Sequence, residues 1–298
     1  MATPNDRSTV VGLAAAVGAY GSWGVLPLYF RALSELSAPT VLAHRVVASI
    51  VFLSFVLVIR RELPAVRAAG AHLRPLVASA VLLAINWLVF VWAVNSGRAL
   101  DTSLGYYVNP LLNVLLGVFF LGESLGAAQV AAVGLAVLGV AVQVWGRGGV
   151  PWVSLVLAGT FAVYGLLRKR TPVGGAPALF VETVAMAPAA VAWLAVAAAR
   201  GEPVLAGDAV TNGLVVGLGV VTAVPLVLFG VAAHRLPLAT MGIVQYLAPT
   251  GQLLTAVLVF HETFTIAHAV SFALIWAGLG LYTVDALIGA RRAPKLAV

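Results

Sequence analysis

The chain contains no cysteine, and only 9% of its 298 residues are charged. The lack of cysteine excludes disulfide bonds, thiolate metal sites, cysteine nucleophiles and iron–sulfur clusters. A soluble domain usually carries about 25% charged residues, whereas 62% of this chain is hydrophobic and its mean hydropathy is +1.05. A folded surface needs polar cover, so lipid must surround most of this chain.

Recognisable catalytic motifs are also missing. The five histidines form no H-E-x-x-H motif, and the chain has no G-x-x-x-x-G-K-[ST] loop for nucleotide phosphates. A G-x-S-x-G motif and paired aspartates within an apolar stretch are absent as well. The longest hydrophilic gap, residues 60–74, is too short for a soluble catalytic domain. We therefore expect no metal or other cofactor, and action within the membrane.

The net charge of +7 would suggest a nucleic-acid partner in a soluble protein. Here the basic residues are scattered among short loops, and the positive-inside rule accounts for them. With ten spans and a cytoplasmic N-terminus, twelve of the seventeen basic residues fall on the inner side. These are Arg7, Arg60, Arg61, Arg67, Arg74, Arg168, Lys169, Arg170, Arg235, Arg291, Arg292 and Lys295. We expect membrane lipid, not nucleic acid, around the protein, and both termini in the cytoplasm.

Ten apolar stretches approach the length of about 20 residues that a helix needs to cross a bilayer. They cover residues 10–30, 38–59, 75–94, 104–121, 125–145, 150–167, 177–199, 213–233, 236–260 and 264–288. The runs are apolar on all sides, whereas the strands of a membrane barrel would alternate apolar and polar residues. The first stretch is longer than the apolar region of a signal peptide, so we interpret it as a retained span.

The fourth and ninth stretches resemble each other. The fourth reads Y-V-N-P-L-L-N over residues 107–113, and the ninth reads Y-L-A-P-T-G-Q over residues 246–252. At an offset of 139 residues the matching pairs are Tyr107 and Tyr246, Pro110 and Pro249, Asn113 and Gln252, and Glu123 and Glu262. We predict two five-helix halves, residues 1–146 and 147–298. Because five is odd, the halves enter the membrane from opposite sides as inverted repeats. The predicted fold class is an all-α membrane protein with ten transmembrane helices.

Six short motifs then indicate a family. They are L-A-H-R (42–45), N-W-L-V-F-V-W-A-V-N (86–95), S-L-G-Y-Y-V-N-P-L (103–111), Y-G-L-L-R-K (164–169), F-V-E-T (180–183) and Q-Y-L-A-P-T (245–250). In this order they resemble the RarD-type permeases, which contain the EamA domain and belong to the drug/metabolite transporter superfamily. The resemblance implies two inverted five-helix bundles around a central pathway in a bacterial inner membrane. It also implies a permease, in a family named for a link to chloramphenicol sensitivity, and it does not specify the substrate.

Pro110 and Pro249 lie within spans, where a proline removes a backbone hydrogen bond and kinks or breaks the helix. Freed carbonyl groups need partners inside the protein. One interpretation is a pair of broken helices that line a cavity, with amide groups from Asn109, Asn113, Gln245 and Gln252. The alternative is a packing kink without a ligand.

Among ionisable residues, His44, Arg45 and Glu182 lie clearly inside spans, where charges are usually paired or functional. Their depths place Arg45 near the outer face and Glu182 near the inner face, so we predict no direct pair between them. The alternative is that Arg45 extends to the headgroups and Glu182 caps a loop. Glu123 and Glu262 lie at span ends, where we favour a carboxylate at a helix N-terminus over a proton-coupling role.

We interpret the chain as a secondary transporter of a small organic metabolite or drug. The predicted substrate pathway contains His44, Arg45, Asn86, Trp87, Tyr106, Asn109, Asn113, Tyr164, Glu182, Gln245 and Gln252. Its aromatic rings could stack on a substrate or anchor the protein at the membrane interface. The alternatives are a membrane-embedded enzyme acting on a lipid-soluble substrate, and a structural subunit. The sequence leaves the substrate, transport direction, coupling ion and a homodimer open.

Overall fold

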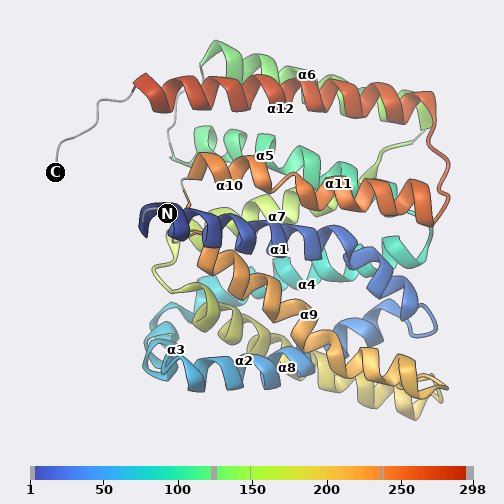
Figure 1. The fold of residues 1–298 in the computed structure, drawn as a ribbon. Coiled ribbons are helices and arrows are strands. Elements are labelled where there is room, and N and C mark those ends of the chain that lie inside the picture. Colours follow the sequence, from blue (N-terminus) through green and yellow to red (C-terminus); the bar gives the residue numbers. More distant parts are fainter. Residues whose placement is uncertain (1–3, 122–125, 148, 234, 237, 293–298) are drawn as a thin grey trace.

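The computed structural model describes residues 4–292 apart from 122–125, 148, 234 and 237. Within these ranges all regular secondary structure is helical (Figure 1). The helices are α1 (Pro4–Ala32), α2 (Ala38–Ile59), α3 (Leu63–Ala69), the short 3₁₀ turn η1 (Gly70–His72), α4 (Leu73–Asn95), α5 (Ala99–Leu121), α6 (Ala127–Arg147), α7 (Trp152–Arg170), α8 (Gly175–Ala199), α9 (Ala209–Ala233), α10 (Leu238–Val244), α11 (Leu247–Leu254), the π-helical turn η2 (Thr255–Val259) and α12 (Ile266–Arg292).

Eight helical segments of the described chain are long and apolar enough to cross a membrane. They are Ser8–Ala32, Ala38–Ile59, Leu63–Asn95, Ala99–Phe120, Ala127–Gly146, Gly175–Ala199, Ala209–Ala232 and Ile266–Asp285. The sixth and ninth predicted spans are not among them. Helix α7 ends in Arg168, Lys169 and Arg170, and the ninth stretch is divided into α10, α11 and η2. The all-α membrane fold is thus confirmed, and the count of ten crossings stays a prediction.

Local sequence explains where α2 begins. Its bounds are those that the hydropathy predicts, residues 38–59. Ser37 has an extended backbone conformation, and its side chain accepts a hydrogen bond from the N–H of Thr40 at 3.4 Å. Pro39 follows in the first turn, where a missing N–H costs nothing. The cap and the proline together determine this end of the helix.

The ninth stretch, residues 236–260, is a broken helix, as one interpretation of Pro249 predicts. A turn at residues 245 and 246 separates α10 from α11. Pro249 lies in the first turn of α11 and cannot donate a hydrogen bond to Gln245, whose carbonyl accepts from Ala248 at 3.2 Å instead. The freed backbone groups therefore end α10 at this point. In contrast, α5 continues as a helix through Pro110.

Helix α5 begins five residues earlier than the apolar stretch at residue 104 predicts. Its first turns contain Asp101, Thr102 and Ser103, which are polar but buried. The carboxylate of Glu262 accepts hydrogen bonds from the backbone N–H of Ala99 at 2.7 Å and of Leu100 at 2.9 Å. Burial raises the pKa of Glu262, and these two N–H groups oppose that rise. The expected carboxylate at a helix N-terminus is present, but the helix is α5 and not α12. Glu123 lies outside the described residues.

The helices form a layered bundle (Figure 1). Helices α6 and α12 pack together at one edge, and α2 packs on α8 at the other. Between these edges, α1 contacts α9 and α11, α5 contacts α7 and α11, α4 contacts α7 and α8, and α2 contacts α9. Helix α1 begins and α12 ends at the same end of the bundle, on the left of Figure 1. Most of the predicted pathway residues therefore lie on helices between the two edges, whereas His44, Arg45 and Glu182 lie on the edge pair α2 and α8.

We expect Glu262→Ala to destabilise the folded protein, because two N–H groups at the start of α5 lose their acceptor. Unmade hydrogen bonds of this kind cost about 1–3 kcal/mol. The melting temperature of the purified protein in detergent would measure the loss. Glu35→Ala, at an exposed glutamate, is the control and should leave the melting temperature unchanged. Equal melting temperatures for the two variants would contradict a role for Glu262 at this helix end.

Candidate functional site

The Arg45 side chain lies inside the bundle and is 6% exposed. Its Nε donates a hydrogen bond to Oγ1 of Thr222 on α9 at 3.0 Å. The guanidinium carbon lies 3.8 Å from the ring centre of Trp87 on α4 and 5.5 Å from that of Phe30 on α1. Aromatic faces attract cations, so four helices together hold this positive charge.

A cluster of amide side chains joins α4, α5 and α7. Asn86 donates to the carbonyl of Leu157 and to Oγ1 of Thr160, each at 3.0 Å, and accepts from the Tyr106 hydroxyl at 2.9 Å. Asn109 donates to the carbonyl of Ala158 at 3.1 Å. The side chains of Asn86 and Asn109 are buried, and those of Tyr106 and Thr160 are partly buried. The hydrogen bonds satisfy amides that would otherwise be costly to bury.

Asn113 extends the amide cluster toward the far end of α5. Its Nδ2 donates to Oδ1 of Asn109 at 3.2 Å. Asn113 is nevertheless exposed, whereas Asn109 is 7% exposed. The row of amides on α5 therefore leads from the buried interior to an accessible position.

Aromatic rings connect the Arg45 region with the start of the second half of the chain. Phe30 packs against Phe90, Phe90 against Tyr106, and Tyr106 against Phe161, each with ring centres 5.9 Å apart. Phe161 stacks on Tyr164 at 5.8 Å. Four helices, α1, α4, α5 and α7, contribute to this continuous series of rings.

Glu182 of α8 ends the series with a second buried charge. Its side chain is 0% exposed, and the Tyr164 hydroxyl donates to Oε2 at 3.3 Å. Nε of Arg168 lies 3.7 Å from Oε1. The sequence places Arg168 in a loop, but α7 continues to Arg170. The spacing of four residues between Tyr164 and Arg168, which puts both on one helix face, is the signal that could have revealed this partner.

Arg45 and Glu182 have different partners and lie near opposite ends of two antiparallel helices. Each is seven residues after the first residue of its helix. Near the start of α2, Nε2 of His44 lies 2.6 Å from the carbonyl of Val204, just beyond the end of α8. Trp193, late in α8, donates to Thr40 at 3.1 Å. The start of α2 therefore faces the end of α8. His44 is bound to a loop and is not beside the Arg45 partners.

The remaining predicted pathway residues form a separate group on α11. Gln252 is 3% exposed, donates to the carbonyl of Trp23 at 3.3 Å and accepts from Thr102 at 3.4 Å. The carbonyl of Pro249 accepts from Ser103 at 2.8 Å. Gln245 is half-buried in the turn before α11. This group joins α1, α5 and α11, and a shared cavity for Pro110 and Pro249 stays a prediction.

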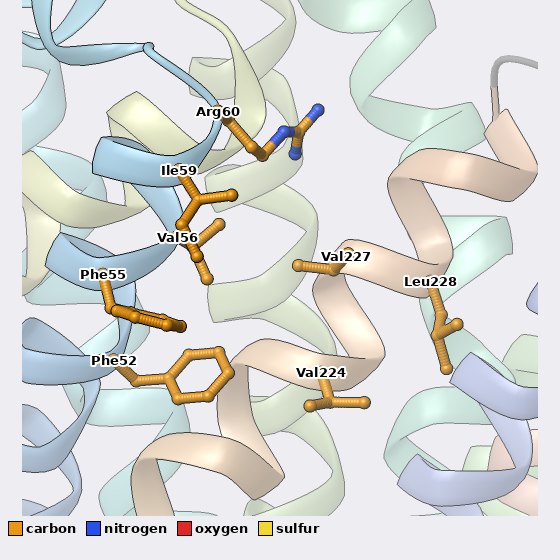
Figure 2. Close-up of a pocket in the computed structure, with 8 residues that line it drawn as sticks. All are labelled: Phe52, Phe55, Val56, Ile59, Arg60, Val224, Val227 and Leu228. Carbon is orange, nitrogen blue, oxygen red and sulfur yellow. The ribbon is translucent and has the colours of Figure 1, made fainter.

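A surface groove lies between α2 and α9 (Figure 2). Its volume is about 230 Å³. Arg60 stands at one end, and the other lining residues, such as Phe55 and Val224, are apolar. Phe55 and Ile59 are 64% and 62% exposed, as expected for side chains in contact with lipid. None of the polar pathway residues lines this groove, so it is not the candidate site.

Comparison with known proteins identifies the family of this chain. The model of the EamA-like transporter family matches residues 10–145. The chain is 46% identical to an uncharacterized transporter of Pseudomonas aeruginosa, over 99% of each chain. It is 33% identical to the chloramphenicol-sensitive protein RarD of the same species, over 91% of this chain and 92% of that protein.

A solved crystal structure shares the fold. It aligns with a TM-score of 0.61 over 94% of this chain and 98% of the other, at 19% identity. At that identity the likeness supports the helical architecture alone. The family model and the relatives go further, and they show that this chain belongs to the EamA-like transporter family as a RarD-type permease.

Proposed function

We propose that the protein is a secondary transporter that moves a small organic solute across the bacterial inner membrane, between two inverted five-helix halves. The first half would contain α1, α2, α4, α5 and α6. The second would contain α7, α8, α9, the α10–α11–η2 segment and α12. The pathway would run along the ring series from Arg45 to Glu182.

The observation that carries this proposal is the pattern of helix contacts. Replacing each helix by its equivalent in the other half turns the pair α1–α9 into α7–α4, and the pair α1–α11 into α7–α5. Likewise, α2 with α9 becomes α8 with α4. All of these pairs are in contact. The pairs α2–α8, α5–α11 and α6–α12 map onto themselves and are also in contact. Such a two-fold pattern is expected of inverted repeats that surround a transport pathway.

The direct test uses purified protein in liposomes, with a panel of metabolites and chloramphenicol first screened by thermal shift. We expect at least one solute to cross the membrane chemically unchanged. Glu182→Gln should slow this transport on the order of tenfold, or about 1.4 kcal/mol, because it breaks the buried pair with Arg168. The control is Glu202→Gln. Glu202 forms an ion pair with Arg200, and the side chains of Arg200 and Glu202 are 64% and 41% exposed. Exposed pairs contribute little, so transport should be unaffected.

The same vesicles distinguish the alternative, a membrane-embedded enzyme acting on a lipid-soluble substrate. An enzyme would convert a panel compound to a product of different mass, whereas a transporter would accumulate it intact. Conversion without accumulation would favour the enzyme. Failure of every panel compound to move would count against transport.

Topology is a second prediction, because both termini are expected in the cytoplasm and α7 must then cross the membrane. A reporter fused after Arg147 should be periplasmic, and one fused after Arg170 cytoplasmic. Fusions after Arg235 and after Thr263 should likewise fall on the inner and outer sides, since the α10–α11–η2 segment must cross. If either pair reports from one side only, the ten-span arrangement is wrong.

Alternating access gives a third prediction from the unequal exposure of two equivalent positions. Asn113 is exposed and Gln252 is 3% exposed. In inverted repeats the opposite state exchanges their environments. Because the chain has no cysteine, single Asn113→Cys and Gln252→Cys variants can be labelled selectively. We expect hydrophilic thiol reagents to label position 113 from the cytoplasmic side and position 252 only from the periplasmic side.

Labelling is measured in right-side-out and inverted membrane vesicles. Val25→Cys, at a position that is 54% exposed on the apolar α1, is the lipid-facing control and should react poorly from both sides. Labelling of both pathway positions from one side would contradict alternating access between the halves.

A further inference from the structure

We propose that the transported solute is an organic monocarboxylate with an apolar body, and that Arg45 binds its carboxylate. The proposal deepens the transport function above and rests on it. It gives a chemical class to a solute that the family assignment leaves open. Three features of the Arg45 environment carry it.

The first feature is the unused hydrogen-bonding capacity of the guanidinium. Arginine has five N–H donors in a planar fork. Within the described part of the chain, the only hydrogen bond from this guanidinium runs from Nε to Thr222. The Thr222 hydroxyl also donates to the carbonyl of Leu218 at 2.7 Å, which orients it toward Arg45 as an acceptor. The terminal nitrogens Nη1 and Nη2 can form two parallel hydrogen bonds to a carboxylate, and they remain available to a ligand.

The second feature is the lack of a neutralising carboxylate. Among the residues that the structure describes, Arg45 forms no ion pair, whereas Glu182, another buried charge, has Arg168 at 3.7 Å. A cation inside a membrane span is costly and is usually retained for function. Arginine stays protonated in proteins, so it cannot avoid the cost by losing its proton. An anionic ligand would supply the missing charge, whereas a cationic ligand would be repelled.

The third feature is the apolar wall beside the charge. Trp87 and Phe30 present their rings to the guanidinium, and Phe90 and Tyr106 continue this series of rings from Phe30. A single fixed positive charge matches a single carboxylate, while a doubly charged phosphate ester would leave one negative charge in the membrane uncompensated. The aromatic wall would pack against the remainder of the solute. The site thus favours one carboxylate attached to an aromatic or branched apolar group.

The experiment compares carboxylates with their own amides and amines on the wild-type protein. The probes are benzoate, phenylacetate and isovalerate, each with its amide and the corresponding amine. Binding to the purified protein is measured by isothermal titration. We expect at least one carboxylate to bind tenfold or more tightly than its amide, about 1.4 kcal/mol, and the amines not to bind. The proposal is overturned if no carboxylate binds better than its amide.

Variants then test the role of Arg45 itself. Arg45→Gln should remove the preference for the carboxylate, and Arg45→Lys should retain part of it, because lysine keeps the charge without the planar fork. Arg200→Gln, at an exposed arginine, should bind as the wild type does. A carboxylate preference that persists in a folded Arg45→Gln protein would place the anion elsewhere. If that variant does not fold, the wild-type comparison alone still decides the proposal.

Failure of this inference and failure of the proposed function give different results. If the liposomes transport a neutral or cationic solute and no carboxylate competes with it, transport stands and the carboxylate assignment falls. If carboxylates bind through Arg45 but nothing crosses the membrane, the site stands as a binding site and the transport proposal falls.

Discussion

The hydrocarbon core of a membrane offers no water to polar groups, and this constraint governs the rest of the structure. Each buried donor or acceptor must find a partner within the protein. The amides Asn86 and Asn109 on α4 and α5 bind backbone carbonyls of α7, and Gln252 on α11 binds a carbonyl of α1. Since apolar side chains have no preference for protein over lipid, these hydrogen bonds help to specify how α4 and α5 pack on α7 and how α11 packs on α1.

The same constraint makes the treatment of charge informative. Glu182 is paired with Arg168 and accepts from Tyr164, which offsets its cost of burial in part, because Oε1 has no hydrogen-bond partner among the described residues. Arg45 receives one hydroxyl and two aromatic faces, which compensate a full charge only in part. Arg45 and Glu182, at equal distances from the starts of antiparallel helices, thus differ in how their charges are compensated. Among the described residues, Glu182 has a partner of opposite charge at one end of the series of rings, and Arg45 has none at the other.

Much of the fold follows from hydropathy alone, because lipid imposes a length and a composition on each span. The bounds of α2 were predictable, since an apolar run, a serine cap and a proline coincide there. The start of α5 was not, because Asp101, Thr102 and Ser103 read as a loop until Glu262, from distant sequence, is seen to bind their helix end. Arg168 was misplaced for a related reason, as its partner lies on another helix. Hydropathy cannot predict the tertiary contacts of polar residues.

The unequal environments of equivalent residues bear on mechanism. Perfect two-fold symmetry would give Asn113 and Gln252 the same exposure, yet one is accessible and the other is held by α1 and α5. Glu262 binds the N-terminal end of α5 through two backbone N–H groups. If the two halves are inverted repeats, as we propose, an asymmetric conformation has an equivalent in which the roles of the halves are exchanged. The two hydrogen bonds that hold Gln252 are long, at 3.3 and 3.4 Å. Under the proposed inverted-repeat plan, a conformation that instead holds Asn113 and exposes Gln252 is the one in which the bundle opens to the other side.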